Sequence, residues 1–195
     1  MAKRAADTAK RVEVRSLDDL HGWLAANHDG SPSVWLVTFR KHTAHYLAYD
    51  DIVSELLCWG WIDSQPRKID DDRTSLLIAP RNPRSAWSAV NKAKIRALRA
   101  AGRLQPAGEA LVTAAKETGM WTFLDDVDRL ERPDDLTRAL GDLVAVWDDW
   151  PRSVQRGTLE WIKTAKTAPT REKRIQDVVD SAASNRRPTP FRRSE

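Results

Sequence analysis

Every strand-like run in the chain lies before residue 81, and the sequence from Ser85 onward is helical in pattern. Strand character appears in the β-branched and aromatic run 34–41 and in two runs after Gly60, "WIDSQPRKI" and "TSLLIAP". "DDDR" joins the last two as a hairpin turn, and Pro66 confines its strand to a sheet edge or a bulge. The sequence therefore predicts an α+β fold, with a small three-stranded antiparallel sheet and helices in the N-terminal half and a helical C-terminal half.

Helix signals recur along the chain. Ser16 followed by Asp19 resembles a capping box, and Gly60 is placed to end, in a left-handed conformation, a helix that begins near Asp50. Beyond Ser85 we expect helices over 85–101, 106–118, 121–131, 134–149, 151–166 and 170–183, the last capped by Thr170.

Length and charge predict one domain between two basic tails. A chain of 195 residues can bury one core but not two full-sized domains. Residues 1–15 carry five Lys/Arg and two Asp/Glu, and residues 186–195 carry four and one, so these ends sum to +6 and the rest to −2. We expect a basic tail over 1–15, a single domain over 16–184 (sheet-bearing 16–84, helical 85–184), and a disordered basic tail over 185–195.

The chain lacks the signals of membrane insertion and export. No apolar run approaches the roughly 20 residues that span a bilayer, and the N-terminus lacks the apolar stretch of a secretory signal. A single cysteine agrees with a reducing compartment. We therefore expect a cytoplasmic protein without a membrane span, and the oligomeric state stays open.

Motifs for common chemistries are missing. The sequence holds no phosphate loop, nucleophile elbow or paired C-x-x-C, and we predict neither a cofactor nor a metal site. His42 and His45 have ligand-like spacing but fall in a predicted turn without a third ligand. Cys58 is more typical of a small buried apolar residue than of a nucleophile. An enzyme that uses Cys58 or Asp63 stays an alternative.

Charge is arranged in blocks along the helical part. Residues 81–103 carry seven Lys/Arg and no acid, residues 117–150 carry ten acids and three bases, and residues 152–174 carry seven bases and two acids. Either the acidic helices pair with the basic ones at the surface, or the basic segments converge on an anion-binding cleft. A further alternative is weak, non-specific nucleic-acid contact through the tails and basic helices.

Polar residues also interrupt apolar helix faces. Helical spacing from Ser85 places Asn91 and Lys94 inside a stripe formed by Trp87, Val90, Leu98 and Ala101. Arg171 lies in the first turn of the last predicted helix, where the helix dipole does not favour a cation. It therefore needs an anionic partner, either an internal carboxylate such as Asp63 or a ligand.

Five ordered segments resemble the YdeI/OmpD-associated bacterial proteins, the bacteriocin-protection family. They are "AYDDIVSELLCWGWID", "APRNPRSAWSAVNK", "PAGEALVTAAKETGMW", "RPDDLTRAL" and "LEWIKTAKTAPTREKRI", and the resemblance covers roughly residues 16–184. Departures from the pattern are Trp59, Ser64 and Gly157. The resemblance implies an α+β fold and a role in resistance to bacteriocins, cationic antimicrobial peptides or stress, without an established reaction.

These observations predict a binding protein for a small anionic ligand. Ring surfaces would come from tryptophans, positive charge from arginine and lysine, and orienting hydrogen bonds from an aspartate and an asparagine. In that order, the predicted ligand-binding residues are Trp61 and Trp87, then Arg81, Lys166 and Arg171, then Asp63 and Asn91.

Overall fold

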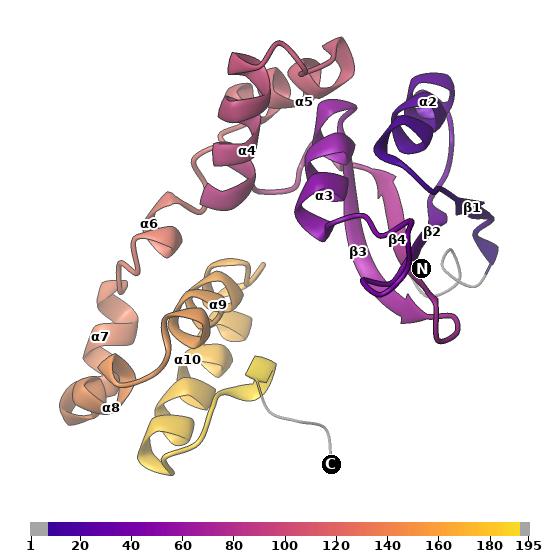
Figure 1. Cartoon of the computed structure of the whole chain (residues 1–195). Helices are drawn as coiled ribbons and strands as arrows, with labels where there is room; N and C mark the ends of the chain where they lie inside the picture. The colour runs from indigo at the N-terminus through magenta and orange to yellow at the C-terminus, as the bar shows by residue number, and fades with distance from the viewer. Residues whose placement is uncertain (1–7, 192–195) are drawn as a thin grey trace. The chain divides into compact units, whose positions relative to one another are not determined.

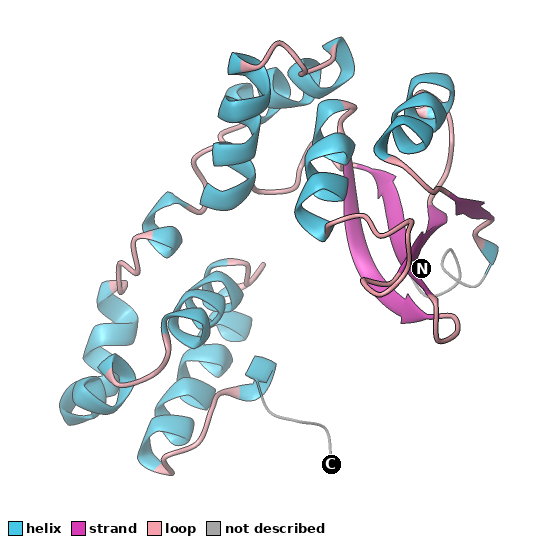
Figure 2. Ribbon diagram, viewed as in Figure 1, coloured by secondary structure: helices cyan, strands magenta, loops and turns pink. Residues whose placement is uncertain are grey.

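The computed structural model describes residues 8–191 and divides into two compact units, Met1–Thr122 (unit 1) and Phe123–Glu195 (unit 2). All strands of the described residues belong to unit 1, and unit 2 is helical (Figures 1 and 2). The break follows Thr122, whereas the sequence indicated a change of architecture at residue 85. The single domain predicted over 16–184 stays a prediction.

The sheet has four strands in the order β1-β2-β4-β3. Strands β2 (Val34–Phe39), β4 (Arg73–Pro80) and β3 (Trp61–Lys68) are antiparallel, as predicted. The prediction of three strands is wrong, because β1 (Arg11–Glu13) adds a parallel fourth strand beside β2. Its charged residues made this segment read as a tail, but they are tolerated because they lie on an exposed edge, while Val12 packs against the core.

Two helices cover one face of the sheet (Figure 2). Helix α2 (Leu17–Asn27) begins with the predicted capping box of Ser16 and Asp19. Helix α3 (Tyr49–Cys58) is followed by Trp59 and then by Gly60, whose φ of 74° confirms the left-handed conformation. Their apolar sides pack on the sheet in a core that includes Leu20, Leu24, Val34, Leu36, Ile52, Leu56, Trp61 and Ile78.

A second core of unit 1 forms where α4 (Ala89–Ala100) and α5 (Pro106–Glu117) pack against α3. Gly108 permits this contact, since a Cβ there would lie 2.5 Å from the carbonyl oxygen of Cys58. The predicted apolar stripe of this helix is wrong, because α4 begins later than expected and Trp87 precedes it. Val90 is 65% exposed, and the buried positions of the helix are Lys92, Ile95 and Leu98.

Unit 2 contains the predicted helical segments in shorter pieces. They are α6 (Asp125–Asp128), α7 (Asp134–Leu140), the 3₁₀ turn η1 (Gly141–Leu143), α8 (Val144–Asp148), α9 (Arg152–Lys163), α10 (Ala168–Ala183) and the 3₁₀ turn η2 (Thr189–Phe191). Helix α10 begins one turn before the predicted cap, because Thr167 and not Thr170 accepts the capping hydrogen bond.

The chain ends differ from the predicted tails where they are described. Residues 11–13 form β1, and residues 1–7 lie outside the described range. In the segment predicted to be disordered, Thr189 in η2 bonds to Asp177 through both its N–H and its Oγ1, at 2.9 and 2.7 Å. The Phe191 ring lies against Gly157 of α9, and residues 192–195 are outside the described range.

Candidate functional site

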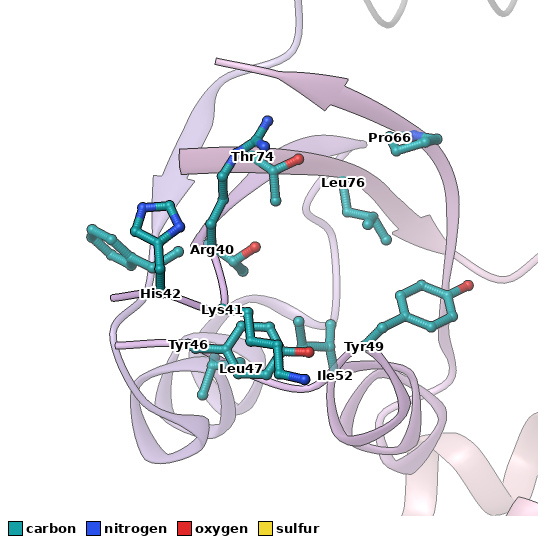
Figure 3. Close-up of a pocket in the computed structure, with 12 residues that line it drawn as sticks. Arg40, Lys41, His42, Tyr46, Leu47, Tyr49, Ile52, Pro66, Thr74 and Leu76 are labelled. Atoms are coloured by element: carbon teal, nitrogen blue, oxygen red, sulfur yellow. The ribbon is translucent and has the colours of Figure 1, made fainter. Parts of the chain in front are cut away.

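A pocket of about 550 Å³ opens in unit 1 between the sheet and the connection from β2 to α3. Figure 3 shows Thr74, Leu76 and Pro66 on the sheet side, across open space from the side chains of the connection and of α3. The full lining is Thr38, Phe39, Arg40, Lys41, His42, Tyr46, Leu47, Tyr49, Ile52, Pro66, Thr74 and Leu76.

The pairing register of the strands determines which side chains form the floor of the pocket. Thr38 pairs with Thr74, and Pro66 pairs with Leu76, so their side chains share one face of the sheet. A bulge between Asp63 and Pro66 sets this arrangement, because strict alternation from Asp63 would have brought Arg67 to this face. The placement confirms Pro66 beside a bulge on an edge strand.

The connection 40–48 forms the opposite wall. Thr43 closes a turn by donating its N–H and Oγ1–H to the carbonyl oxygen of Arg40, at 2.9 and 2.8 Å. A bridge joins Phe39 to Tyr46, and the Phe39 and His45 rings lie 5.4 Å apart. These contacts fold the connection back along the end of β2, which turns Tyr46 and Leu47 toward the sheet.

The pocket is positive at one end. Arg40, Lys41 and His42 line it, and none of the described lining residues carries a carboxylate. His42 has an anionic neighbour outside the lining, since its Nε2 lies 2.9 Å from Oδ1 of Asp72. Arg40 extends toward Thr74 (Figure 3), and its Nε is buried without a hydrogen-bond partner in the described chain. The polar end thus offers donors and positive charge.

Tyr49 borders the pocket and contacts a predicted site residue. Its hydroxyl donates to Oδ2 of Asp63 at 2.8 Å. Partial burial, followed by the hydrogen bond and charge of Asp63, raises the pKa of Tyr49 to about 12. Asp63 therefore serves as an acceptor for a neutral phenol at this site.

The structure brings Arg81 and Trp87 together at the other end of β4. The Arg81 guanidinium lies 4.0 Å from the Trp87 ring centroid, and its Nη2 donates to the carbonyl oxygen of Ala86 at 2.7 Å. Trp87 also packs on Trp121, with ring centroids 5.3 Å apart. Burial lowers the pKa of Arg81 to about 10.

Trp61 and Asn91 have different surroundings. Trp61 is 1% exposed, packs in the core under α2 and donates its Nε1–H to the carbonyl oxygen of His28 at 3.2 Å. It therefore offers no free ring face. Asn91 lies in the first turn of α4, where its backbone N–H donates to Oγ of Ser88.

Arg171 has its anionic partner inside unit 2. Its Nε and Nη2 bond to the two carboxylate oxygens of Asp135 at 2.7 and 2.9 Å. Other bases of the segment 152–174 also pair with the acidic block, as in Lys163 with Asp126 and Arg156 with Asp128. Lys166 lies exposed between α9 and α10. These contacts favour surface pairing between the acidic block 117–150 and the basic segment 152–174.

Neither Cys58 nor the potential metal ligands of the described residues have the features of a reactive site. Cys58 is 1% exposed, and burial raises the pKa of its thiol to about 11, whereas a thiol nucleophile needs a lowered pKa. Within residues 8–191, no three His, Cys, Asp or Glu side chains gather into a group that could hold a metal ion.

The sequence contains one signal for the pocket, in a segment that contributes none of the predicted ligand-binding residues. Both tyrosines of the chain and two of its four histidines fall within "KHTAHYLAY", directly after a predicted strand. Polar aromatic residues gathered in a connecting segment are typical of a binding loop.

Comparisons with known proteins agree with this division of the chain. Residues 12–111 match a family described as a domain of unknown function, DUF8412, and residues 129–185 match the family described as "Bacteriocin-protection, YdeI or OmpD-Associated". The second match confirms the resemblance for the C-terminal segment. We found no match among curated proteins or solved structures. Among the described helices, none has both the length and the apolar character that crossing a bilayer requires.

Proposed function

We propose that this chain, which belongs to the family described as a domain of unknown function (DUF8412), binds a small anion with an apolar body. The geometry of unit 1 supports this function, with the ligand in the pocket beside α3. The volume of about 550 Å³ falls in the range of roughly 300–1,000 Å³ that small-molecule sites occupy. The apolar wall suits a hydrocarbon or aromatic body, and the basic end suits an acidic group.

One observation carries the proposal. The side chain of Arg40 makes no ion pair or hydrogen bond with any described residue, and its Nε is buried. A buried donor without an acceptor costs about 1–3 kcal/mol. A carboxylate or sulfonate group can accept two guanidinium hydrogen bonds at once, which would remove this cost.

An amphipathic anion that fluoresces in apolar sites tests the proposal. We expect anilinonaphthalene sulfonate to bind the folded protein saturably and octanoate to displace it. Arg40→Met should weaken the affinity for each of the two compounds by about tenfold or more, since a hydrogen bond to a charged group contributes roughly 1.5–3 kcal/mol.

Arg67→Met is the matched control. Arg67 lies on the opposite face of the sheet, exposed and stacked on Trp35 at 4.3 Å, so its loss should leave pocket binding unchanged. Near-UV circular dichroism of each variant verifies that it is folded. Equal binding by wild type and a folded Arg40→Met protein would refute the assignment of the pocket.

The match over residues 129–185 supports a broader role in protection against bacteriocins, which we extend to cationic antimicrobial peptides. The basic end of the pocket would repel a cationic peptide, so we place the anionic ligand, not the peptide, in unit 1. Protection would then be indirect. Non-specific nucleic-acid contact through the basic tails and helices stays an alternative; of the nine Lys/Arg in the tails, Lys3, Arg4, Arg192 and Arg193 lie outside the described residues.

A further inference from the structure

A second arginine, Arg81, is buried without a counter-ion at the end of the sheet away from the pocket. It is 7% exposed, and no carboxylate among the described residues pairs with it. One face of its guanidinium lies on Trp87 at 4.0 Å, and its Nε is buried without a hydrogen-bond partner. The one hydrogen bond that its guanidinium makes to the described chain joins Nη2 to the carbonyl oxygen of Ala86.

Other buried or partly buried charges of unit 1 are compensated, as Glu55 and Lys94 show. Glu55, which is 3% exposed, accepts hydrogen bonds from Arg103 and Trp59 and lies 2.7 Å from Nδ1 of His21. Lys94 pairs with Asp50 and also donates to Ser54. A stacked ring and one carbonyl group compensate only part of the lost hydration of a guanidinium, which stays charged at neutral pH. Arg81 is thus a buried cation whose charge no carboxylate of the described residues balances.

The surroundings of Arg81 also favour an anion. Helix α4 begins at Ala89, three residues after the carbonyl group that Arg81 contacts, and its first turn contains no acidic residue. The positive end of the helix dipole therefore adds to the potential of the guanidinium. The whole segment 81–103 carries seven Lys/Arg and no acid.

We propose that Arg81 anchors a second anion site, distinct from the pocket at Arg40, which binds a small oxyanion of the phosphate class. Trp87 holds the guanidinium plane, Ala86 fixes one edge through its carbonyl oxygen, and the oxyanion takes remaining N–H donors. Thr74 of the pocket and Arg81 lie at opposite ends of β4, so the two sites bind independently.

Isothermal titration of the full chain with inorganic phosphate, in chloride buffer of constant ionic strength, tests the site. We expect saturable binding at one site in wild type, a loss of at least tenfold in affinity in Arg81→Met, and a smaller loss in Arg81→Lys, which keeps the charge but not the planar fork. If Arg81→Met fails to fold, Arg81→Lys decides: affinity unchanged from wild type overturns the proposal.

Two further variants separate this site from other sources of binding. Arg67→Met removes an arginine that is also stacked on a tryptophan but exposed, and it should bind phosphate as wild type does. Arg40→Met should also keep phosphate binding, whatever it does to octanoate. Absence of saturable phosphate binding in wild type, or equal affinity in folded Arg81→Met, overturns the second site.

Discussion

Single arginines of this chain differ in what their guanidinium groups contact. Arg171 was predicted to need an anionic partner, and its partner is Asp135, 36 residues earlier in the chain. In Arg40 and in Arg81, the buried Nε has no hydrogen-bond partner among the described residues. Sequence reasoning could select Arg171 and Arg81 as candidate ligand-binding residues, but it could not distinguish a paired arginine from an unpaired one, because the partner is set by tertiary folding.

Tyr49 offers a direct measurement at the edge of the pocket. The chain has two tyrosines, so in Tyr46→Phe the ultraviolet absorbance of tyrosinate reports Tyr49 alone. We expect its midpoint at about pH 12, mainly because of partial burial and then because of the bond to Asp63. Adding Asp63→Asn should lower the pKa of Tyr49 toward 10.0, since the negative charge is gone.

The same shift predicts how stability depends on pH. The pKa of Tyr49 is higher in the folded chain than the ordinary value of 10.0, so the unfolded chain loses this proton first. Its contribution is complete below pH 10 and is lost as the pH rises toward 12. A titration midpoint near 10 in Tyr46→Phe, unaffected by Asp63→Asn, would contradict the contact.

Among the elements, those with local signals were predictable and those defined by pairing were not. Capping at Ser16 and the left-handed Gly60 follow from side-chain and backbone preferences of a few residues. Strand β1 has three residues and no periodicity that exceeds chance, and only its neighbour β2 makes it a strand. The bulge in β3 depends likewise on the register with β4.

Helix α9 and the turn η2 form a contact that a double-mutant cycle can measure. Gly157→Ala should gain roughly 1 kcal/mol of helix propensity, but its Cβ would lie 2.4 Å from Cζ of Phe191. We expect the substitution to be neutral or destabilising in wild type and stabilising by about 0.5–1 kcal/mol in Phe191→Ala. Urea denaturation gives the free energy of unfolding for the four proteins.

Gly22→Ala is the control for this cycle. Gly22 lies within α2, and a Cβ there would meet nothing within 4 Å, so Gly22→Ala should be stabilising by propensity alone. An equal effect of Gly157→Ala with and without the Phe191 ring would show that the two residues are not coupled.

For the whole molecule, fold class was predictable from the order of strand-like and helical runs, whereas the site was not. The pocket lies in unit 1, between a strand, a connection and a helix, and only the folded sheet brings Pro66 and Thr74 opposite Tyr46. The predicted ligand-binding set spans both units, with Lys166 and Arg171 in unit 2.

The proposed protective role is tested at this scale, in cells. A sensitive bacterium that expresses the full chain should survive a bacteriocin or a cationic antimicrobial peptide better than one with an empty vector, by about tenfold. Because protection is proposed to act through the anionic ligand, Arg40→Met should lose it and Arg67→Met should keep it. Survival equal to the empty vector, at matched expression, would contradict the role.

The bulge in β3 also determines where this protein can tolerate insertions and deletions. Between Asp63 and Pro66, β3 has one residue more than β4 has between the partners Ile78 and Leu76. Loss of that extra residue would leave a regular strand, with Pro66 and all later positions on their present faces. Loss of one residue after Pro66 would instead move every later side chain of β3 to the opposite face of the sheet. Relatives can therefore differ in length at the bulge and still share the same pocket floor.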